Sequence, residues 1–334
     1  MSGTGVVGAL NTNRDDAHRA PSRSARVEAE SGKKRAPKCA LLAPMPRVTT
    51  VQAAFETLRL EDEASGSTVS IAPARGGMVT RFSAGNVPVL FLDETTLLDT
   101  TKSVRGGVPI LFPIAGKLPE DHYEVGGRTY VMKQHGFARN LPWTVLDEST
   151  RDGASVTLGL DATVATRAQY PFVFALRFTY RLRGATLTLE QRFENHGDVP
   201  MPVQPGLHPY FYVPDATKAG ARVDTDATRA YDNVTGREIA VTSPIALAGH
   251  EVDLHLLDHG PRGTLLHRPG LPSVRIGFGD DQRALVVWTV PGRDFVCVEP
   301  WRAKFGALAD GTAPQIAPGE FASTTLTLSL ADAT

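Results

Sequence analysis

Residues 172–182 show a period of two in their side chains. Every even position there is apolar or aromatic, and two of the intervening positions are arginine. A period of two is typical of a strand with one buried and one solvated face, as in an antiparallel sheet. Arg183 and Gly184 then form a turn, and the alternation resumes through Phe193. Residues 172–194 are therefore predicted to form a long hairpin.

Much of the remaining chain shows short strand-like runs separated by turn residues. Glycine (31 residues) and proline (24) punctuate these runs, and no segment shows an amphipathic helix of three turns. A second hairpin is predicted at Glu124–Thr129, where two glycines supply the turn. These features predict an all-β fold, a large antiparallel β-sandwich, formed by a single domain over residues 49–334. Further strands are predicted near residues 68–73, 79–83, 88–92, 143–148, 154–160, 273–278, 284–290, 294–299 and 321–330.

Residues 1–48 differ from the rest. The stretch from Asn11 to Pro37 is rich in charged and small residues and has no aromatic side chain. Such a segment buries too little apolar area to offset its ordering entropy, so a disordered tail is predicted. It lacks the apolar stretch of a signal peptide, and its acidic residues disfavour a transit peptide. Met45 is an alternative start of the natural chain.

The composition excludes several function classes. A formal net charge of −1 gives no electrostatic reason to expect nucleic acid or an anionic membrane as a partner. No apolar run approaches the ~20 residues of a transmembrane helix. Cys39 and Cys297 are the only cysteines, which is compatible with a reducing compartment and argues against a structural zinc site. A cytoplasmic protein without cofactor or metal is expected.

Three ionisable residues lie in motifs that resemble the walls of a binding site. His135 precedes Gly136, which permits a close backbone approach. His208 precedes a rigid proline and two aromatic residues. Glu299 ends an apolar strand and is followed by Pro300-Trp301, a setting that removes water and raises a carboxyl pKa. Two imidazoles and a carboxylate are suited to moving protons on a neutral, oxygen-rich substrate.

Other patterns are less informative. Arg105 stands beside two glycines and is suited to gripping hydroxyls or a phosphate, or to capping a carboxylate. Nucleotide-binding glycine motifs and the serine nucleophile elbow do not occur. The ordinary alternative for Glu299 is an ion pair with Arg302. Six other histidines lie in tail-like or turn-like sequence and are expected to be structural: His18, His196, His250, His255, His259 and His267.

Taken together, four collinear motifs resemble the aldose 1-epimerase (mutarotase) family, including its hexose-6-phosphate mutarotase branch. The resemblance covers roughly residues 55–330 and implies a galactose mutarotase-like supersandwich with an open sugar-binding cleft. The motifs are Arg105–Pro113, Gln134–Arg139 with Asn140–Trp143, Gly206–Phe211 and Val296–Trp301.

The resemblance also implies roles for individual residues. Glu299 matches the general base that takes the proton of the anomeric hydroxyl, and His208 matches the acid that protonates the ring oxygen. His135 would assist at the ring oxygen. Two arginines, Arg105 and Arg139, would bind substrate oxygens. The sugar-binding aspartate of the family is assigned to Asp253, with Asp258 as a rival.

The substrate and two other function classes stay open. Parts of the sequence resemble the hexose-6-phosphate branch, whereas residues 116–123 and the following hairpin resemble free-aldose enzymes, which are favoured. A phosphate would need converging basic groups, for which Arg105, Lys117, Arg139 and Arg302 are available. A non-catalytic sugar-binding protein on the same fold is one alternative. A glycoside-cleaving enzyme is the other, although it usually needs two flanking carboxylates.

Overall fold

The computed structural model describes residues 45–260 and 263–331. The predicted tail therefore lies almost wholly outside the described residues, and the domain boundary at residue 49 stays a prediction. The first strand, β1, spans Arg47–Gln52. Within the described residues, no helix is long and apolar enough to cross a membrane.

The largest sheet has nine strands in the order β19-β16-β21-β22-β26-β12-β11-β10-β9. All neighbouring pairs in it are antiparallel. In chain order its strands are β9 (Thr144–Ser149), β10 (Ala154–Asp161), β11 (Phe174–Arg183), β12 (Thr186–Asn195), β16 (Arg222–Val223), β19 (Ile245–Ala246), β21 (Thr264–His267), β22 (Val274–Phe278) and β26 (Phe321–Leu330).

An eight-stranded sheet carries the candidate site. Its strands run in the order β18-β17-β20-β23-β24-β14-β6, and β15 also pairs with β24. In chain order they are β6 (Ile110–Leu111), β14 (Gly206–Leu207), β15 (Tyr210–Tyr212), β17 (Arg229–Asp232), β18 (Arg237–Ala240), β20 (Val252–Leu256), β23 (Ala284–Thr289) and β24 (Phe295–Trp301).

The remaining elements are smaller. A five-stranded sheet follows chain order from β1 to β5, and two further pairs join β7 to β8 and β13 to β25. The strands are β2 (Glu56–Asp62), β3 (Ser67–Ala72), β4 (Met78–Ala84), β5 (Val87–Pro88), β7 (His122–Val125), β8 (Arg128–Val131), β13 (Met201–Pro202) and β25 (Gln315–Ile316). The short helices are α1 (Glu94–Leu98), α2 (Val164–Arg167) and the 3₁₀ turns η1 (Pro73–Arg75), η2 (Pro119–Asp121), η3 (Ala138–Asn140) and η4 (Asp215–Gly220).

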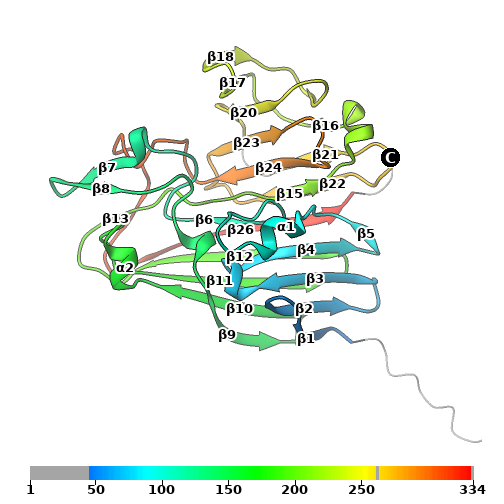
Figure 1. The fold of residues 1–334 in the computed structure, drawn as a ribbon, viewed down its shortest axis with the longest axis horizontal. Coiled ribbons are helices and arrows are strands. Elements are labelled where there is room, and N and C mark those ends of the chain that lie inside the picture. Colours follow the sequence, from blue (N-terminus) through cyan, green and yellow to red (C-terminus); the bar gives the residue numbers. More distant parts are fainter. Residues whose placement is uncertain (1–44, 261–262, 332–334) are drawn as a thin grey trace, which may run out of the picture. The chain divides into compact units, whose positions relative to one another are not determined.

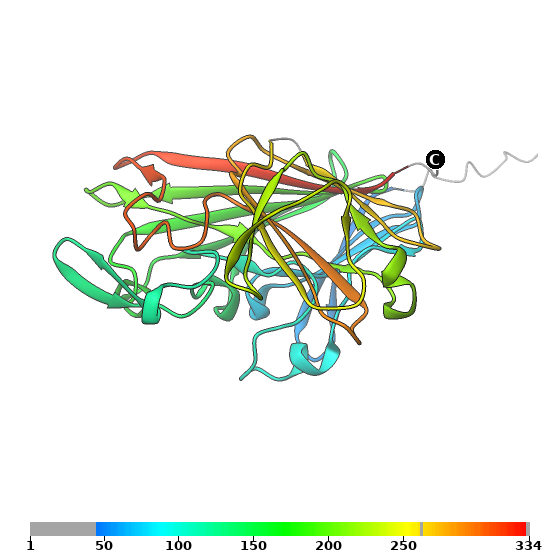
Figure 2. The ribbon, with the colours of Figure 1, turned by 90° about the horizontal axis from the view of Figure 1, so that it is seen from above.

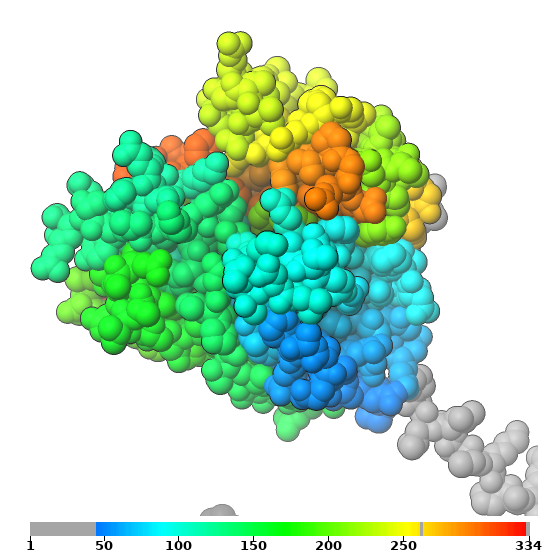
Figure 3. Space-filling view, viewed as in Figure 1, coloured from blue at the N-terminus to red at the C-terminus, as the bar shows by residue number. Residues whose placement is uncertain are grey.

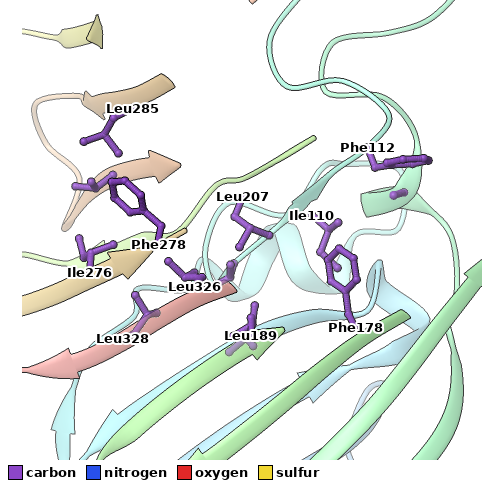
Figure 4. Packing of buried hydrophobic residues seen from close by; sticks show 14 of the residues in the cluster. Ile110, Phe112, Phe178, Leu189, Leu207, Ile276, Phe278, Leu285, Leu326 and Leu328 are labelled. Atoms are coloured by element: carbon purple, nitrogen blue, oxygen red, sulfur yellow. The ribbon is translucent and has the colours of Figure 1, made fainter. Parts of the chain in front are cut away.

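Two layers of sheet enclose one continuous apolar core. The five-stranded sheet, blue in Figure 1, packs on β10 and β11 of the nine-stranded sheet, and Figure 2 shows the two as separate layers. The eight-stranded sheet lies over the other half of the large sheet. In Figure 4, Leu207 and Leu285 of the eight-stranded sheet share this core with Leu326 and Leu328 of β26. The predicted all-β sandwich is confirmed.

The strand predictions are largely confirmed. β11 and β12 pair from Phe174 with Asn195 to Arg183 with Thr186, as the alternation predicts, and Gly184 takes the positive φ of 56° at the turn. The hairpin at 124–129 is also present as β7 and β8. The strand predicted at 88–92 is wrong. β5 ends at Pro88, and the chain then reaches the eight-stranded sheet through an isolated bridge from Leu90 to Phe211 of β15, while Leu92 bridges Gly106 in the loop before β6.

The buried aromatic residues of β11 provide a test of the core. Phe178 is fully buried, and its ring packs 5.1 Å from Trp143 and 5.5 Å from Phe193, measured between centroids. Phe178→Ala should lower the free energy of unfolding by about 3–5 kcal/mol, because it leaves a cavity in the apolar core. Urea unfolding followed by fluorescence measures the loss. The control Val164→Ala, at an 88% exposed position, should change it by less than about 0.5 kcal/mol.

Candidate active site

All six residues predicted for the site line one cavity of about 350 Å³. Its walls come from segments coloured cyan, teal, yellow and orange in Figure 3, which meet on the face shown there. The volume falls within the range of small-molecule sites. Its walls are formed by Ser103, Val104, Arg105, Gly116, Lys117, Gln134, His135, Arg139, His208, Tyr210, Asn233, Asp253, His255, Val286, Trp288, Glu299, Trp301 and Phe305.

Glu299 lies in the middle of the site because of the register of β24. It pairs with Val286 of β23, and its side chain is only 2% exposed. Trp301 Nε1 donates a hydrogen bond of 3.2 Å to Glu299 Oε2. Burial raises the pKa of Glu299 well above its usual range, and the nearby charge of Asp253 adds to the effect. The alternative ion pair with Arg302 is absent, since Arg302 binds Asp281 at 2.9 Å.

His208 stands directly against Glu299. Its backbone N–H donates to Pro109 O at 3.1 Å between β14 and β15, and its ring stacks on Tyr210 with centroids 4.6 Å apart. His208 Nε2 lies 3.3 Å from Glu299 Oε1. Burial, together with the positive charge of Arg139, lowers the pKa of His208 to about 3. Burial thus favours the neutral form of both groups over an ion pair.

His135 is held by two hydrogen bonds to Gly116. Its backbone N–H donates to Gly116 O at 2.9 Å, and its Nδ1 accepts a hydrogen bond of 3.0 Å from the Gly116 N–H. An accepting Nδ1 leaves the proton of the neutral ring on Nε2, so that nitrogen is a donor. Burial, followed by the charge of His208, holds the pKa of His135 well below its usual value. His135 also has a φ of 67°, an uncommon backbone conformation that often marks functional positions.

The predicted close approach at Gly136 is present. Its φ is 65°, and a side chain there would collide with the carbonyl of Phe112. Phe137 N donates to the same carbonyl at 3.0 Å. The glycine thus lets the loop that carries His135 lie against the segment that follows β6.

Asp253 lies on the wall of the cavity formed by β20, and its sugar-binding role stays a prediction. Asn233 Nδ2 donates to its Oδ2 at 2.6 Å, and His255 Nε2 lies 3.4 Å from its Oδ1. Burial alone would raise the pKa of Asp253, but the hydrogen bonds from His255 and Asn233 outweigh it and lower that pKa. The rival Asp258 is not among the cavity residues. Instead it accepts hydrogen bonds from the backbone N–H groups of Thr228 and Arg229.

The expectation that His255 lies in turn-like sequence is wrong. It belongs to β20, contacts Asp253, and packs against Trp301 with ring centroids 5.3 Å apart. The sequence analysis also missed Asn233 and Trp288. For Trp288 a signal was present, since the alternation in 284–290 places Val286 and Trp288 on one face.

Three cationic side chains belong to the cavity. Arg105 lies 5.9 Å from the centre of the Trp288 ring, and Arg139 Nη2 donates to Gln134 O at 3.0 Å. Lys117 completes the set, and both Lys117 and Arg105 are exposed. Arg302 does not line the cavity. Arg105 and Lys117 are therefore on the solvent side of a site in which His208 and Glu299 are buried. Arg139, in contrast, is partly buried and close enough to affect the pKa of both buried groups.

This arrangement is suited to proton transfer. Two imidazoles and a carboxylate converge in the cavity, and the aromatic residues Tyr210, Trp288 and Trp301 line it beside them. Within the described residues, one set of potential metal ligands occurs, formed by His208, Cys297 and Glu299.

A family model described as aldose 1-epimerase matches residues 56–325. An Escherichia coli K12 protein named "Putative glucose-6-phosphate 1-epimerase" is 32% identical over 136 residues, which cover 40% of this chain and 42% of the relative. A Cenchrus ciliaris protein of the same name is 25% identical over 250 residues, 67% of this chain and 72% of the relative. The chain thus matches less than half the length of the first relative.

Two solved structures extend the comparison. The Slr1438 protein of Synechocystis sp. PCC 6803 is 35% identical, with a TM-score of 0.80, over 87% of this chain and 98% of the other. A galactose mutarotase-like protein of Clostridium acetobutylicum, 18% identical, has a TM-score of 0.75 over 86% of this chain and 99% of the other. The second likeness shows the fold.

The protonation state of His208 is directly testable. Because burial depresses its pKa, the ring should remain neutral as pH falls from 7 to about 5, where an unperturbed histidine with a pKa near 6.5 is mostly protonated. Nitrogen-15 NMR of histidine-labelled protein reads the ring state, and His208→Asn identifies the signal. A His208 ring that titrates near pH 6.5 would contradict the effect of burial described above.

Proposed function

Because this chain belongs to the aldose 1-epimerase family, we propose that it is an isomerase that interconverts the α and β anomers of an aldohexose. The observation that carries the proposal is the buried pair of His208 and Glu299, 3.3 Å apart on the wall of the cavity. Ring opening needs one group to remove a proton and another to supply one, and it needs no redox cofactor.

The pair is best treated as a single unit that holds one proton. Burial favours the neutral form of each group, so in the empty cavity the proton resides on Glu299 and His208 is neutral. Transfer of that proton to His208 Nε2 across the 3.3 Å contact produces a carboxylate and an imidazolium. The reactive state thus has the same number of protons as the resting state.

In the proposed reaction, Glu299 takes the proton of the anomeric O1 hydroxyl. His208 gives its proton to the ring oxygen, the bond between C1 and the ring oxygen breaks, and O1 becomes the aldehyde oxygen. Rotation about C1–C2 and the reverse proton transfers close the ring as the other anomer. His135, whose Nε2 is a donor, supports the ring oxygen. Asp253, held by Asn233 and His255, accepts from sugar hydroxyls.

Polarimetry or NMR of freshly dissolved α-D-glucose and α-D-galactose tests this function. The protein should accelerate mutarotation above the buffer rate. Methyl α-D-glucoside is the matched control, since it lacks a free anomeric hydroxyl and should be left intact. Release of methanol from it would instead identify a glycoside-cleaving enzyme. Sugar binding without any acceleration, by folded protein, would identify a non-catalytic binding protein.

Removal of either member of the pair should abolish most turnover. Glu299→Gln and His208→Asn should each lower kcat by about 10²–10⁴-fold, the usual contribution of a positioned acid or base. Glu299→Gln preserves side-chain shape and His208→Asn introduces no bulk, so sugar binding measured by calorimetry should largely persist. A loss of kcat below about tenfold would remove the substituted residue from the acid–base role.

A phosphorylated aldohexose is the second candidate substrate, and the cations of the cavity favour it over the free sugar preferred on sequence alone. Arg105, Lys117 and Arg139 lie on the same cavity. Guanidinium and ammonium groups are the usual partners of a phosphate. The names of the Escherichia coli and Cenchrus ciliaris relatives agree with this choice.

Lys117→Gln separates the two substrates. It should raise KM for glucose 6-phosphate by about tenfold or more, because a hydrogen bond to a charged group is lost, and leave KM for free glucose nearly unchanged. Lys133→Gln is the control, since Lys133 is exposed and pairs with Asp121 outside the cavity. Equal changes for the two sugars would exclude Lys117 as a phosphate ligand. The KM values for the two sugars are compared by following anomer exchange by NMR at several substrate concentrations.

A further inference from the structure

Cys297 lies behind the proposed acid–base pair. It shares one face of β24 with Glu299, because side chains two positions apart in a strand point the same way. Tyr210 of β15 pairs with Cys297 in the sheet, which holds the preceding His208 close to the same face. The three ligand atoms of His208, Cys297 and Glu299 lie within 4.8 Å of one another, and all three residues are buried.

The spacing of these atoms suits a tetrahedral cation. Bonds of about 2.0 Å from zinc to nitrogen and oxygen place those two atoms about 3.3 Å apart in a tetrahedron. His208 Nε2 and Glu299 Oε1 are already 3.3 Å apart. A zinc–sulfur bond of about 2.3 Å places the sulfur about 3.5 Å from the other two ligand atoms, so the Cys297 sulfur has to approach by about 1.3 Å at most.

We propose that His208, Cys297 and Glu299 form an inhibitory site for a thiophilic d¹⁰ cation such as Zn²⁺ or Cd²⁺. The ion enters from the cavity, which His208 and Glu299 line. It displaces the thiol proton of Cys297 and the proton of Glu299 to solvent. Thiolate, imidazole and carboxylate are all ligands of zinc, and the fourth position faces the cavity.

The remaining contacts of the ligands agree with this site. Trp301 engages only Oε2 of Glu299, so Oε1 is available. His208 Nδ1 has no hydrogen-bond partner among the described residues. Without a partner to orient the ring, affinity should be lower than in a dedicated zinc site, as expected for reversible inhibition. Inhibition rests on the proposed function, because the ion would occupy the path of the shared proton. Binding of the ion itself does not depend on that function.

Cadmium binding can be read without any substrate. In a Cys39→Ser background Cys297 is the sole thiol of the chain. Titration with Cd²⁺ should then produce the ultraviolet charge-transfer absorbance of a cadmium–thiolate bond, with one ion per chain. Cys297→Ala in the same background should lack this absorbance. Absence of the band from the parent, or its persistence in the alanine variant, would overturn the proposal. Circular dichroism confirms that each variant is folded, and Cys297→Ser serves as a second variant.

Activity provides the second arm. Zn²⁺ should inhibit mutarotation by the Cys39→Ser parent reversibly, with recovery on adding EDTA. Cys297→Ala should keep its turnover without metal and need at least about tenfold more Zn²⁺ for the same inhibition, since it loses the softest ligand. Equal sensitivity of the two proteins would overturn the inhibitory role. Failure to detect mutarotation at all would count against the proposed function, while the cadmium titration would still decide the metal site.

Discussion

The rest of the site depends on the burial of the Glu299 carboxyl group on β24, a strand that is covered on both faces. Every residue of β24 is buried. Val296 and Val298 belong to the main core, whereas Cys297, Glu299 and Trp301 face the other way. A charge at such a place costs free energy unless it is paired or neutralised. The register of β23, β14 and β15 on β24 therefore positions the groups that compensate for Glu299.

His208 provides that compensation without a full ion pair. In the proposed mechanism the two groups, 3.3 Å apart, share one proton, which avoids a net charge in the core and still lets the proton move between them. Burial shifts the pKa values of the two groups in opposite directions, upward for Glu299 and downward for His208. The same desolvation strengthens the interactions of either charged form with a substrate once water is excluded.

The sequence predicts the fold well, because the fold depends on local patterns. Alternation specifies β11 and β12, and the short motifs single out His135, His208 and Glu299, all of which line the cavity. Residues brought in by pairing between distant strands were not predictable. His255 and Asn233 reach the site only because β20 pairs with β17 and β23. The partner of Arg302 is likewise set by tertiary packing, which places Asp281 beside it.

The side chains of the site differ in solvent exposure, and this difference separates their proposed roles. The acid–base pair is nearly inaccessible, with His208 7% and Glu299 2% exposed, whereas Arg105 and Lys117 are exposed. An exposed cation is screened and stays charged, so it can attract an anionic substituent without altering the shared proton strongly. Arg139, which is partly buried, does act on Glu299: its charge lowers the pKa of that carboxyl, against the larger effect of burial. The exposed cations Arg105 and Lys117 can therefore be exchanged with less effect on the proposed proton transfer at the base of the cavity than Arg139.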